Sequence, residues 1–302
     1  MPGSEFEPRH LLHLQDIRSG VLFFICESAP RPRGMWYDKA VPGTQVPSVG
    51  GRAGKGTVQS MYQDNRELRR LVRALRQTNG QGQVAVLQEI GGKLINEYRV
   101  EAFGIDIRPL WVEAYYYDEE RFPDLNTHRS AKQKDRFGRL YFHERGYGGV
   151  DLCLSDGEDI YLSFLLKATL VEGRFLTQTG LCHLPDWAGR TRADLERLDC
   201  VLVPGEERHT VCYTTRVDLA RPCYSGEKLT AFALDALPQY DFRFGRRNLR
   251  ENVREYLTDY LAGHPDCTPE ECRAQCRRVF GWAPAFVSEL AGGQRLAKGA
   301  KE

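Results

Sequence analysis

The sequence has no long hydrophobic run, and this absence argues against a membrane protein. A membrane-spanning helix needs about 20 consecutive apolar residues, whereas the longest early apolar stretch is the short GVLFFIC at 20–26. The opening MPGSEFEPRH lacks a basic segment that leads into a long apolar one, so it does not resemble a secretion signal. We therefore expect a cytoplasmic protein with no membrane partner.

A strong net charge is also missing, because 42 basic and 41 acidic residues leave a formal charge of +1. The chain as a whole therefore has no bulk attraction to phosphate, and any nucleic-acid-binding surface must come from local basic segments. The nine cysteines are scattered without the density of a secreted disulfide scaffold. This cysteine usage is typical of a reducing cytoplasm.

Two candidate cofactor sites fail on their spacing. GGRAGKGT at 50–57 resembles a phosphate-binding loop, but that pattern's first Gly and its final Ser or Thr are Val49 and Gly56 here. The second candidate is a cluster of possible zinc or iron–sulfur ligands: His264, Cys267, Cys272 and Cys276. Its spacing matches no common site, and its last two cysteines lie one helical turn apart, which favours a helix packed on the core. We predict neither a metal nor a cofactor.

Local patterns predict a single α+β domain with a curved, mainly antiparallel sheet flanked by helices. Residues 1–63 form an N-terminal segment with a Gly/Pro-rich arm, and the domain occupies 64–302. Leu68, Leu71, Val72 and Leu75 define one face of a basic amphipathic helix over 64–80. β-branched and aromatic runs predict strands at 91–105, 107–117, 138–144, 149–155, 159–173, 198–203 and 210–219. Further helices are predicted at 192–198, 246–262 and 268–279.

Glu113 is the strongest single anomaly, because it interrupts the apolar and aromatic run LWVEAYYY. Side chains alternate along a strand, so Trp111, Glu113 and Tyr115 share one face. A carboxylate between two rings is partly removed from water, and it becomes a better proton acceptor if a polar partner positions it. The alternative is an ordinary Glu on an edge strand in water.

Two basic segments contain interleaved aromatic residues, at 128–149 and at 243–254. Basic side chains hold phosphates while rings stack on bases, so this mixture suits a nucleic-acid groove. Each segment alone is also typical of a solvated charged face. Their joint presence in a nearly neutral chain favours nucleic acid.

The order of these motifs resembles that of the alkyladenine (3-methyladenine) DNA glycosylases. That family has E-A-Y at a strand end, an acidic loop with His, an Arg-rich segment, G-x-L-Y, and L-L-R-A followed by E-G. The corresponding stretches here are Glu113-Ala114-Tyr115, His128, GRLYFHERGYGGVDLCLS at 138–155 and LLKATLVEG at 165–173. GGKLI at 91–95 resembles an early strand of the family, and TTRVDLA and DFRF resemble its late strands. The resemblance covers roughly 84–245.

The resemblance implies a role for individual residues. Glu113 would activate water for attack on the sugar C1′, Tyr115 would stack on the extruded base, and His128 would hydrogen-bond in its pocket. His143 takes the place of a second stacking Tyr, Cys153 that of a pocket Asn, and Lys167 that of an Arg. Tyr147 becomes the duplex wedge if the alignment slips by one residue from Gly146. The DNA-binding cations would be Arg136, Arg139, Arg145, Lys167, Arg243 and Arg246.

The resemblance implies a monomeric, monofunctional glycosylase that flips a modified base out of double-stranded DNA and leaves an abasic site. The altered base-contacting positions and a longer loop before His128 favour a bulky phage base such as glucosylated hydroxymethylcytosine, and hence anti-phage defence. Alkylpurine repair is the alternative. A non-catalytic nucleic-acid-binding module and a metal-dependent nuclease using the DEE at 118–120 are two further hypotheses.

Overall fold

The computed structural model describes residues 65–134, 136–143, 148–157, 159–199, 201–236, 246–280 and 282–299, with backbone alone for 246–249 and 293–299. The chain divides into two units, Met1–Arg52 and Ala53–Glu302, and all described residues belong to the second. The predicted N-terminal segment 1–63 therefore lies outside the described residues.

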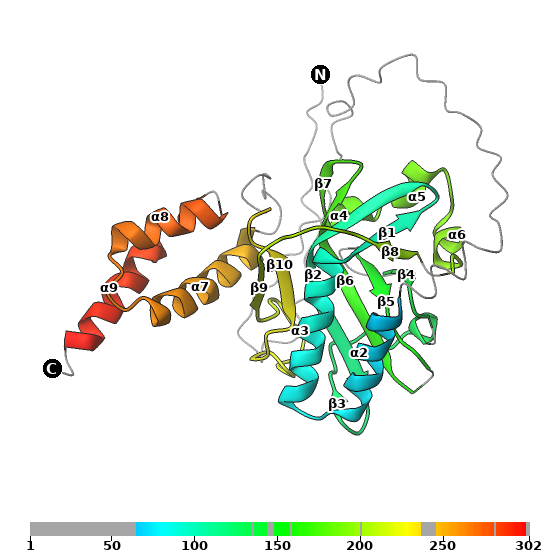
Figure 1. Cartoon of the computed structure of the whole chain (residues 1–302), viewed down its shortest axis with the longest axis horizontal. Coiled ribbons are helices and arrows are strands. Elements are labelled where there is room, and N and C mark those ends of the chain that lie inside the picture. Colours follow the sequence, from blue (N-terminus) through cyan, green and yellow to red (C-terminus); the bar gives the residue numbers. More distant parts are fainter. Residues whose placement is uncertain are drawn as a thin grey trace, which may run out of the picture. The chain divides into compact units, whose positions relative to one another are not determined.

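An antiparallel sheet forms the centre of the described structure, and helices flank it as the sequence predicts (Figure 1). The main path runs β4–β5–β6–β2–β1–β8, while β10 pairs with both β2 and β9, β3 pairs with β2, and β7 pairs with β6. The strands are β1 (Tyr98–Ala102), β2 (Ile105–Asp118), β3 (Phe122–Pro123), β4 (Arg139–Phe142), β5 (Val150–Cys153), β6 (Tyr161–Val171), β7 (Arg174–Thr177), β8 (Leu202–Pro204), β9 (Val211–Thr214) and β10 (Thr230–Ala233). The long strands β2 and β6 confirm the predictions at 107–117 and 159–173.

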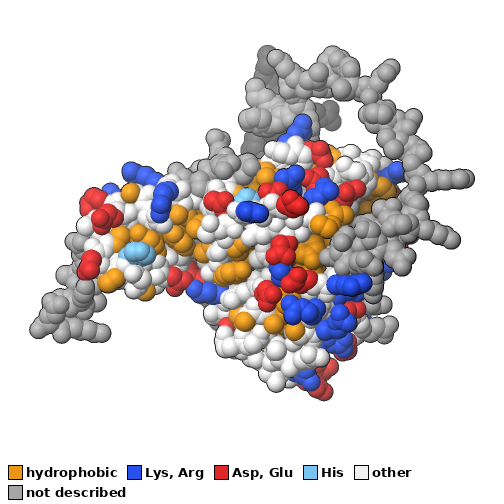
Figure 2. All heavy atoms as spheres, in the orientation of Figure 1, with side chains coloured by type: hydrophobic (Ala, Val, Ile, Leu, Met, Phe, Trp, Pro, Cys, Tyr) orange, Lys and Arg blue, Asp and Glu red, His pale blue; other side chains and the backbone are white. Residues whose placement is uncertain are grey.

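Two helices, α2 (Arg66–Gln77) and α3 (Gln81–Asn96), precede the sheet, and α3 packs on β2 and β10. The predicted helix at 64–80 is α2; its apolar face is buried, Arg66, Arg70 and Arg73 are exposed, and Arg69 packs on the Phe137 ring. Basic and acidic side chains lie side by side on the surface of this part of the molecule (Figure 2). The predicted strand at 91–105 is wrong over its first part, because α3 continues to Asn96. A Cβ on Gly91 would lie 3.1 Å from the Ala231 Cβ, so this glycine lets the helix approach the sheet closely.

Short helices follow β7: α4 (Gln178–Leu181), α5 (Leu184–Ala188) and α6 (Arg192–Glu196), while the 3₁₀ turn η1 (Ala131–Gln133) precedes β4. The last helices are α7 (Arg246–Gly263), α8 (Pro269–Phe280) and α9 (Phe286–Gly299). Thr215 N donates to Glu255 Oε2 at 2.8 Å, and Asn252 Nδ2 donates to Thr214 Oγ1 at 2.6 Å, so α7 is fixed to the end of β9. No described helix is long and apolar enough to span a bilayer.

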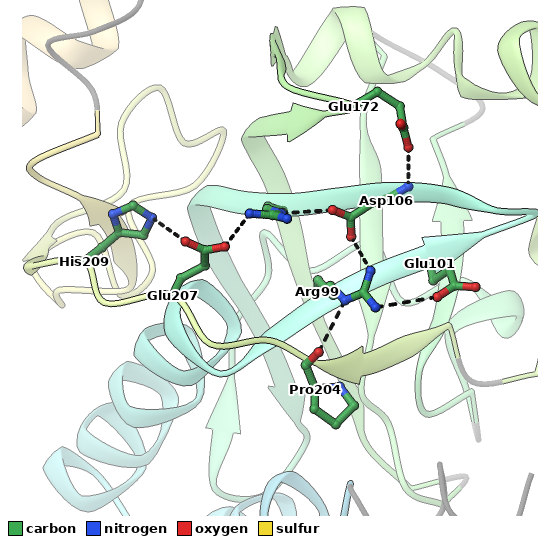
Figure 3. A network of polar contacts seen from close by, with 8 residues as sticks. Arg99, Glu101, Asp106, Glu172, Pro204, Glu207 and His209 are labelled. Atoms are coloured by element: carbon green, nitrogen blue, oxygen red, sulfur yellow. Dashed lines mark hydrogen bonds and ion pairs between the residues drawn. The ribbon is translucent and has the colours of Figure 1, made fainter. Parts of the chain in front are cut away.

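A partly exposed network of charges joins β1, β2 and the segment after β8 (Figure 3). Asp106 accepts from Arg99 Nη1 at 2.8 Å and from Arg108 Nε at 2.9 Å, and Arg108 Nη1 continues to Glu207 Oε1 at 2.5 Å. His209 Nε2 lies 3.9 Å from Glu207 Oε2. We call these five residues the edge network; it ties the β8–β9 connection to the sheet.

Candidate active site

A row of residues crosses the sheet on the face opposite α3. Glu113 in β2 is paired with Leu165 in β6, and Leu165 is paired in turn with Asp151 in β5. Direct cross-strand neighbours project to the same side of a sheet, so the two carboxylates flank the Leu165 side chain. Alternation puts Tyr115 beside Glu113 and Lys167 beside Leu165 on this same face.

Glu113 is buried, with only 1% of its surface exposed, and it lies in a central strand between β6 and β10. The alternative of an edge-strand Glu in water is therefore wrong. Glu113 Oε2 lies 3.0 Å from Lys167 Nζ, so the ammonium compensates the buried negative charge. The other oxygen, Oε1, is buried and has no hydrogen-bond partner among the described residues. A buried acceptor left in this way costs about 1–3 kcal/mol, so it is suited to receive a water or a substrate group.

Tyr115 lies between Glu113 and a buried ion pair. The Arg216 guanidinium lies 4.9 Å from the centre of the Tyr115 ring, and its Nη1 donates to Asp124 Oδ2 at 2.6 Å and to Ala114 O at 3.2 Å. Burial, and then the Glu113 charge, raise the pKa of Tyr115 well above its ordinary value. The phenol therefore stays neutral and keeps its O–H as a donor. Since Arg216 occupies one face of the ring, a stacked base would use the other face.

Arg216 has unused hydrogen-bonding capacity that the sequence does not reveal. Its side chain and that of Asp124 have no exposed surface. Its Nε and Nη2 are buried without a hydrogen-bond partner among the described residues. Because Nε and Nη2 form one edge of the planar guanidinium, they can donate together to a group with two acceptors.

Asp151 is the centre of a second polar group on this face. Its Oδ2 accepts from Ser163 Oγ at 2.8 Å and from Gln133 Nε2 at 3.2 Å, and its Oδ1 lies 2.8 Å from His143 Nε2. Sequence reasoning missed Asp151. The signal was the same as for Glu113, because Asp151 interrupts the apolar run GVDLCLS. Ser163 and Gln133 hold the Asp151 carboxylate in place, and the carboxylate in turn orients the His143 imidazole.

His128 and His143 are brought together although they lie on different segments. Their ring centroids are 4.3 Å apart, and the Tyr141 ring lies 5.6 Å from His143 and 6.3 Å from His128. Burial, and then the nearby His143, lower the pKa of His128, while Asp151 opposes this. His128 has an exposed side and thus lies at the border of the cluster. We call Glu113, Lys167, Tyr115, Asp151, His143 and His128 the carboxylate cluster.

Cys153, predicted in the base pocket, is paired with Ser163 and shares the face of Asp151. Its side chain has no exposed surface, and burial, followed by the Asp151 charge, raises the pKa of its thiol well above its ordinary value. A neutral, enclosed thiol is a packing group and a poor nucleophile.

Three of the predicted DNA-binding residues are described with their side chains, and each has a protein partner. Arg136 Nη1 donates to Glu196 O at 3.3 Å, and Arg139 forms an ion pair with Asp199. Lys167 belongs to the carboxylate cluster. Arg246 begins α7, but its side chain is not among those described, and three residues lie outside the described part of the chain: Arg145, Tyr147 and Arg243.

Within the described residues, no group of three or more His, Cys, Asp or Glu side chains is placed to hold a metal ion. The cysteines of the candidate C-terminal cluster are buried, as expected of a helix packed on the core. Burial raises the pKa of Cys272 to about 11 and that of Cys276 to about 12. The remaining candidate ligand, His264, forms a different contact: its Nδ1 lies 2.8 Å from the backbone oxygen of Tyr260.

Comparisons with models of protein families and with curated proteins find no match to this chain.

Proposed function

We propose that the protein is a monofunctional DNA glycosylase, which extrudes a modified base and hydrolyses its N-glycosidic bond to leave an abasic site. The observation that carries the proposal is Glu113, a buried carboxylate with one oxygen 3.0 Å from Lys167 Nζ and the other without a hydrogen-bond partner among the described residues. Such a group can position a water molecule and accept its proton as the base departs. The resemblance of the motifs around Glu113 to those of alkyladenine glycosylases supports the same reaction.

The neighbouring residues suit an extruded base. The Arg216 guanidinium lies over one face of the Tyr115 ring, so an extruded base would stack on the other, and the neutral hydroxyl can hydrogen-bond to it. His128 lies at the exposed border of the cluster, where it can meet an incoming ligand. Extrusion costs a few kcal/mol, and stacking of one base on an aromatic side chain is worth about 1–3 kcal/mol. Phosphate contacts must supply the remainder.

In the proposed reaction, the C1′–N bond breaks and its electron pair goes to the base. Water attacks C1′ and gives one proton to Glu113. The step requires neither a metal nor a covalent bond to lysine. The substrate that we favour remains a bulky modified cytosine such as glucosylated hydroxymethylcytosine, with alkylpurines as the alternative.

The test uses the full chain, Glu113→Gln and a matched control, Glu101→Gln. The control replaces an exposed Glu of β1, which lies 3.9 Å from Arg99. Each protein is incubated with duplexes that contain glucosylated hydroxymethylcytosine, methylated purines or unmodified bases, in parallel buffers with Mg²⁺ and with EDTA. Released bases are measured by mass spectrometry, and thermal melts establish that each variant is folded.

We expect wild type and Glu101→Gln to release one class of modified base, and Glu113→Gln to be slower by about 10²–10⁴-fold, as for loss of a general base. The class released identifies the substrate. DNA binding without release of any base would overturn the proposal in favour of a binding module. Cleavage of the backbone that EDTA abolishes would favour a metal-dependent nuclease.

A further inference from the structure

We propose that Lys167 forms a covalent imine with the abasic product, so that the protein holds the abasic site after the base has left. Base release itself remains hydrolysis by water, and the imine is a second activity of the same site. The inference rests on the proposed function, because that function places the sugar C1′ beside Glu113. Lys167 is then both the counter-charge of Glu113 and the nucleophile of the second step.

Lys167 lies in β6 on the sheet face opposite α3, where its amine meets the proposed base. Its Nζ lies 3.0 Å from Glu113 Oε2 and 5.4 Å from the centre of the Trp111 ring. The Lys167 side chain is 13% exposed, whereas that of Glu113 is 2% exposed. Of these two partners, the amine is therefore the one that an incoming group reaches more readily.

The amine of Lys167 has hydrogen-bonding capacity that its protein partner does not use. An ammonium group carries three N–H donors, and Glu113 is the single acceptor in contact with Nζ among the described residues. Lys93 is held differently, because Glu67 and Glu97 lie 3.1 Å and 2.9 Å from its ammonium. Lys167 is thus held by one carboxylate, and that carboxylate is the one that the proposed reaction uses.

The distances of the proposed hydrolysis bring C1′ close to this amine. A water that Glu113 activates lies about 2.6–3.2 Å from a carboxylate oxygen, and the carbon that it attacks lies about 3–3.5 Å from the water. Lys167 contacts the other oxygen of the same carboxylate. Its flexible four-carbon stem lets Nζ move from Glu113 to C1′ after the base has left.

The abasic product presents a functional group with which an amine reacts. Hydrolysis leaves a hydroxyl on C1′, and this hemiacetal is in equilibrium with an open-chain aldehyde. Lysine amines form Schiff bases with carbonyl groups, and a neighbouring base that takes their proton activates them. Glu113 is such a base at 3.0 Å. The group that activates water in the first step therefore also activates the amine in the second.

The proton and electron balance of the imine closes without an added reagent. Nζ passes one proton to Glu113, and its lone pair bonds to C1′ while the π electrons of the carbonyl group move to oxygen. A second proton moves from nitrogen to that oxygen, which gives a carbinolamine. Glu113 then protonates the hydroxyl, which leaves as water, and the nitrogen lone pair completes the C=N bond. Water reverses these steps and restores Lys167 and the abasic site.

The protonated imine preserves the charge balance around Glu113. It carries the same single positive charge as the ammonium that it replaces, and Glu113 ends the sequence as a carboxylate. A buried carboxylate without a counter-charge is strongly destabilised. The imine therefore forms without leaving the Glu113 charge uncompensated.

The experiment traps the imine on a duplex with a preformed abasic site, so it does not depend on base release. Wild type, Lys167→Arg and the matched control Lys93→Arg are incubated with this duplex and sodium cyanoborohydride, which reduces an imine to a stable secondary amine. Each protein is compared at DNA concentrations that saturate its binding. Covalent adducts are quantified on denaturing gels, and mass spectrometry of proteolytic fragments identifies the attached residue.

The two variants make the same change in similar surroundings. Arginine keeps the positive charge, but its guanidinium stays protonated and is not a nucleophile. The side chains of Lys167 and Lys93 are 13% and 15% exposed. Burial acts to lower the pKa of Lys93, but hydrogen bonds to Glu97 and Glu67 more than offset this, so the pKa is raised. Lys93 therefore stays protonated, and it lies in α3, on the other face of the sheet.

We expect wild type and Lys93→Arg to form the adduct at Lys167 to similar extents. Lys167→Arg should lose it by about tenfold or more, because no amine remains beside Glu113. Thermal melts show whether each variant is folded, and if Lys167→Arg does not fold, the residue attached in the wild-type adduct decides. A strand break at the abasic site that Lys167→Arg alone fails to produce would also support the imine, because a Schiff base promotes elimination of the 3′ phosphate.

Three results would overturn the inference while leaving hydrolysis by Glu113 intact. They are the absence of an adduct with wild type, attachment to an amine other than Lys167, and an undiminished adduct in Lys167→Arg. An adduct at Lys167 combined with failure to release any base from a modified duplex is a different result, because it overturns the proposed function and supports the imine.

Discussion

The edge network and the carboxylate cluster contain the same kinds of side chain in opposite surroundings. In the edge network, the side chains of Arg99, Asp106 and Arg108 are 37%, 26% and 46% exposed, and each finds partners at ordinary distances. In the cluster, the Glu113 side chain is 2% exposed and its neighbour Arg216 has no exposed surface. Both nevertheless retain polar atoms without partners among the described residues.

This difference indicates where the molecule is organised for stability and where for chemistry. Exposed ion pairs contribute little because water already solvates both charges. Buried charges cost several kcal/mol unless they are paired, and open polar atoms add to that cost. A fold can dispense with such groups, so their presence together on one sheet face is a reason to look for a ligand there.

The largest expected effect comes from breaking the Arg216–Asp124 pair. Arg216→Met leaves the Asp124 carboxylate enclosed without its counter-charge, and we expect the free energy of unfolding to fall by about 3–5 kcal/mol. Arg99→Met, its matched exposed control, should cost less than about 1 kcal/mol. Urea unfolding at pH 7 measures both. Similar losses in the two variants would remove the energetic distinction between the regions.

Lys167 tests whether the charge on Glu113 is compensated by its partner. Lys167→Met should lower the free energy of unfolding by about 2–4 kcal/mol, because the buried Glu113 carboxylate loses its counter-charge. This loss is smaller than that for Arg216→Met, because the Lys167 side chain is partly exposed to solvent. The double variant Lys167→Met with Glu113→Gln should be more stable than Lys167→Met alone, since neither position of the pair then carries an uncompensated charge. A double-mutant cycle from urea unfolding gives the coupling. Strictly additive losses would mean that the two side chains do not compensate each other.

Much of the sheet was predictable from sequence, because alternation and long β-branched runs report directly on strands. β2 and β6 follow from such runs, and the Glu113 anomaly follows from reading β2 as buried. The same alternation put Tyr115 on the face of Glu113. The early strand at 91–95 was wrong because Gly91 and Gly92 were read as strand punctuation. In α3 they are contact positions, since a Cβ on Gly92 would lie 2.5 Å from the Tyr213 hydroxyl.

The rest of the site depends on contacts between distant segments, which a single sequence does not reveal. Arg216 lies 92 positions from Asp124, and nothing in either local pattern predicts that they meet. Asp151 interrupts an apolar run, which indicates a buried polar residue. Its role, however, depends on its contact with His143, which lies eight positions earlier in the chain and which the local pattern does not predict. The charge of an arginine likewise predicts that its side chain reaches the surface, but it does not predict which residues the side chain contacts. Arg136 and Arg139 both contact the segment around α6, and neither contact follows from the local pattern.

The smallest expected effect is the pH dependence of the edge network. Burial acts to raise the pKa of Asp106, but hydrogen bonds from Arg99 and Arg108 more than offset it, so the pKa lies below its ordinary value. A lowered pKa in the folded state means that these contacts stabilise the protein above the unfolded pKa of about 3.9. That contribution is lost as the pH falls through the folded pKa.

Asp106→Asn should therefore lower the free energy of unfolding by less than about 1 kcal/mol at pH 7, and the difference from wild type should vanish near pH 2. Added salt should shrink it at neutral pH, because charges this exposed are screened. Urea unfolding at several pH values measures the difference, with Glu119→Gln in the exposed turn after β2 as the control. A large loss that persists in acid and in high salt would show that the edge network stabilises the fold by packing, which would weaken its contrast with the carboxylate cluster.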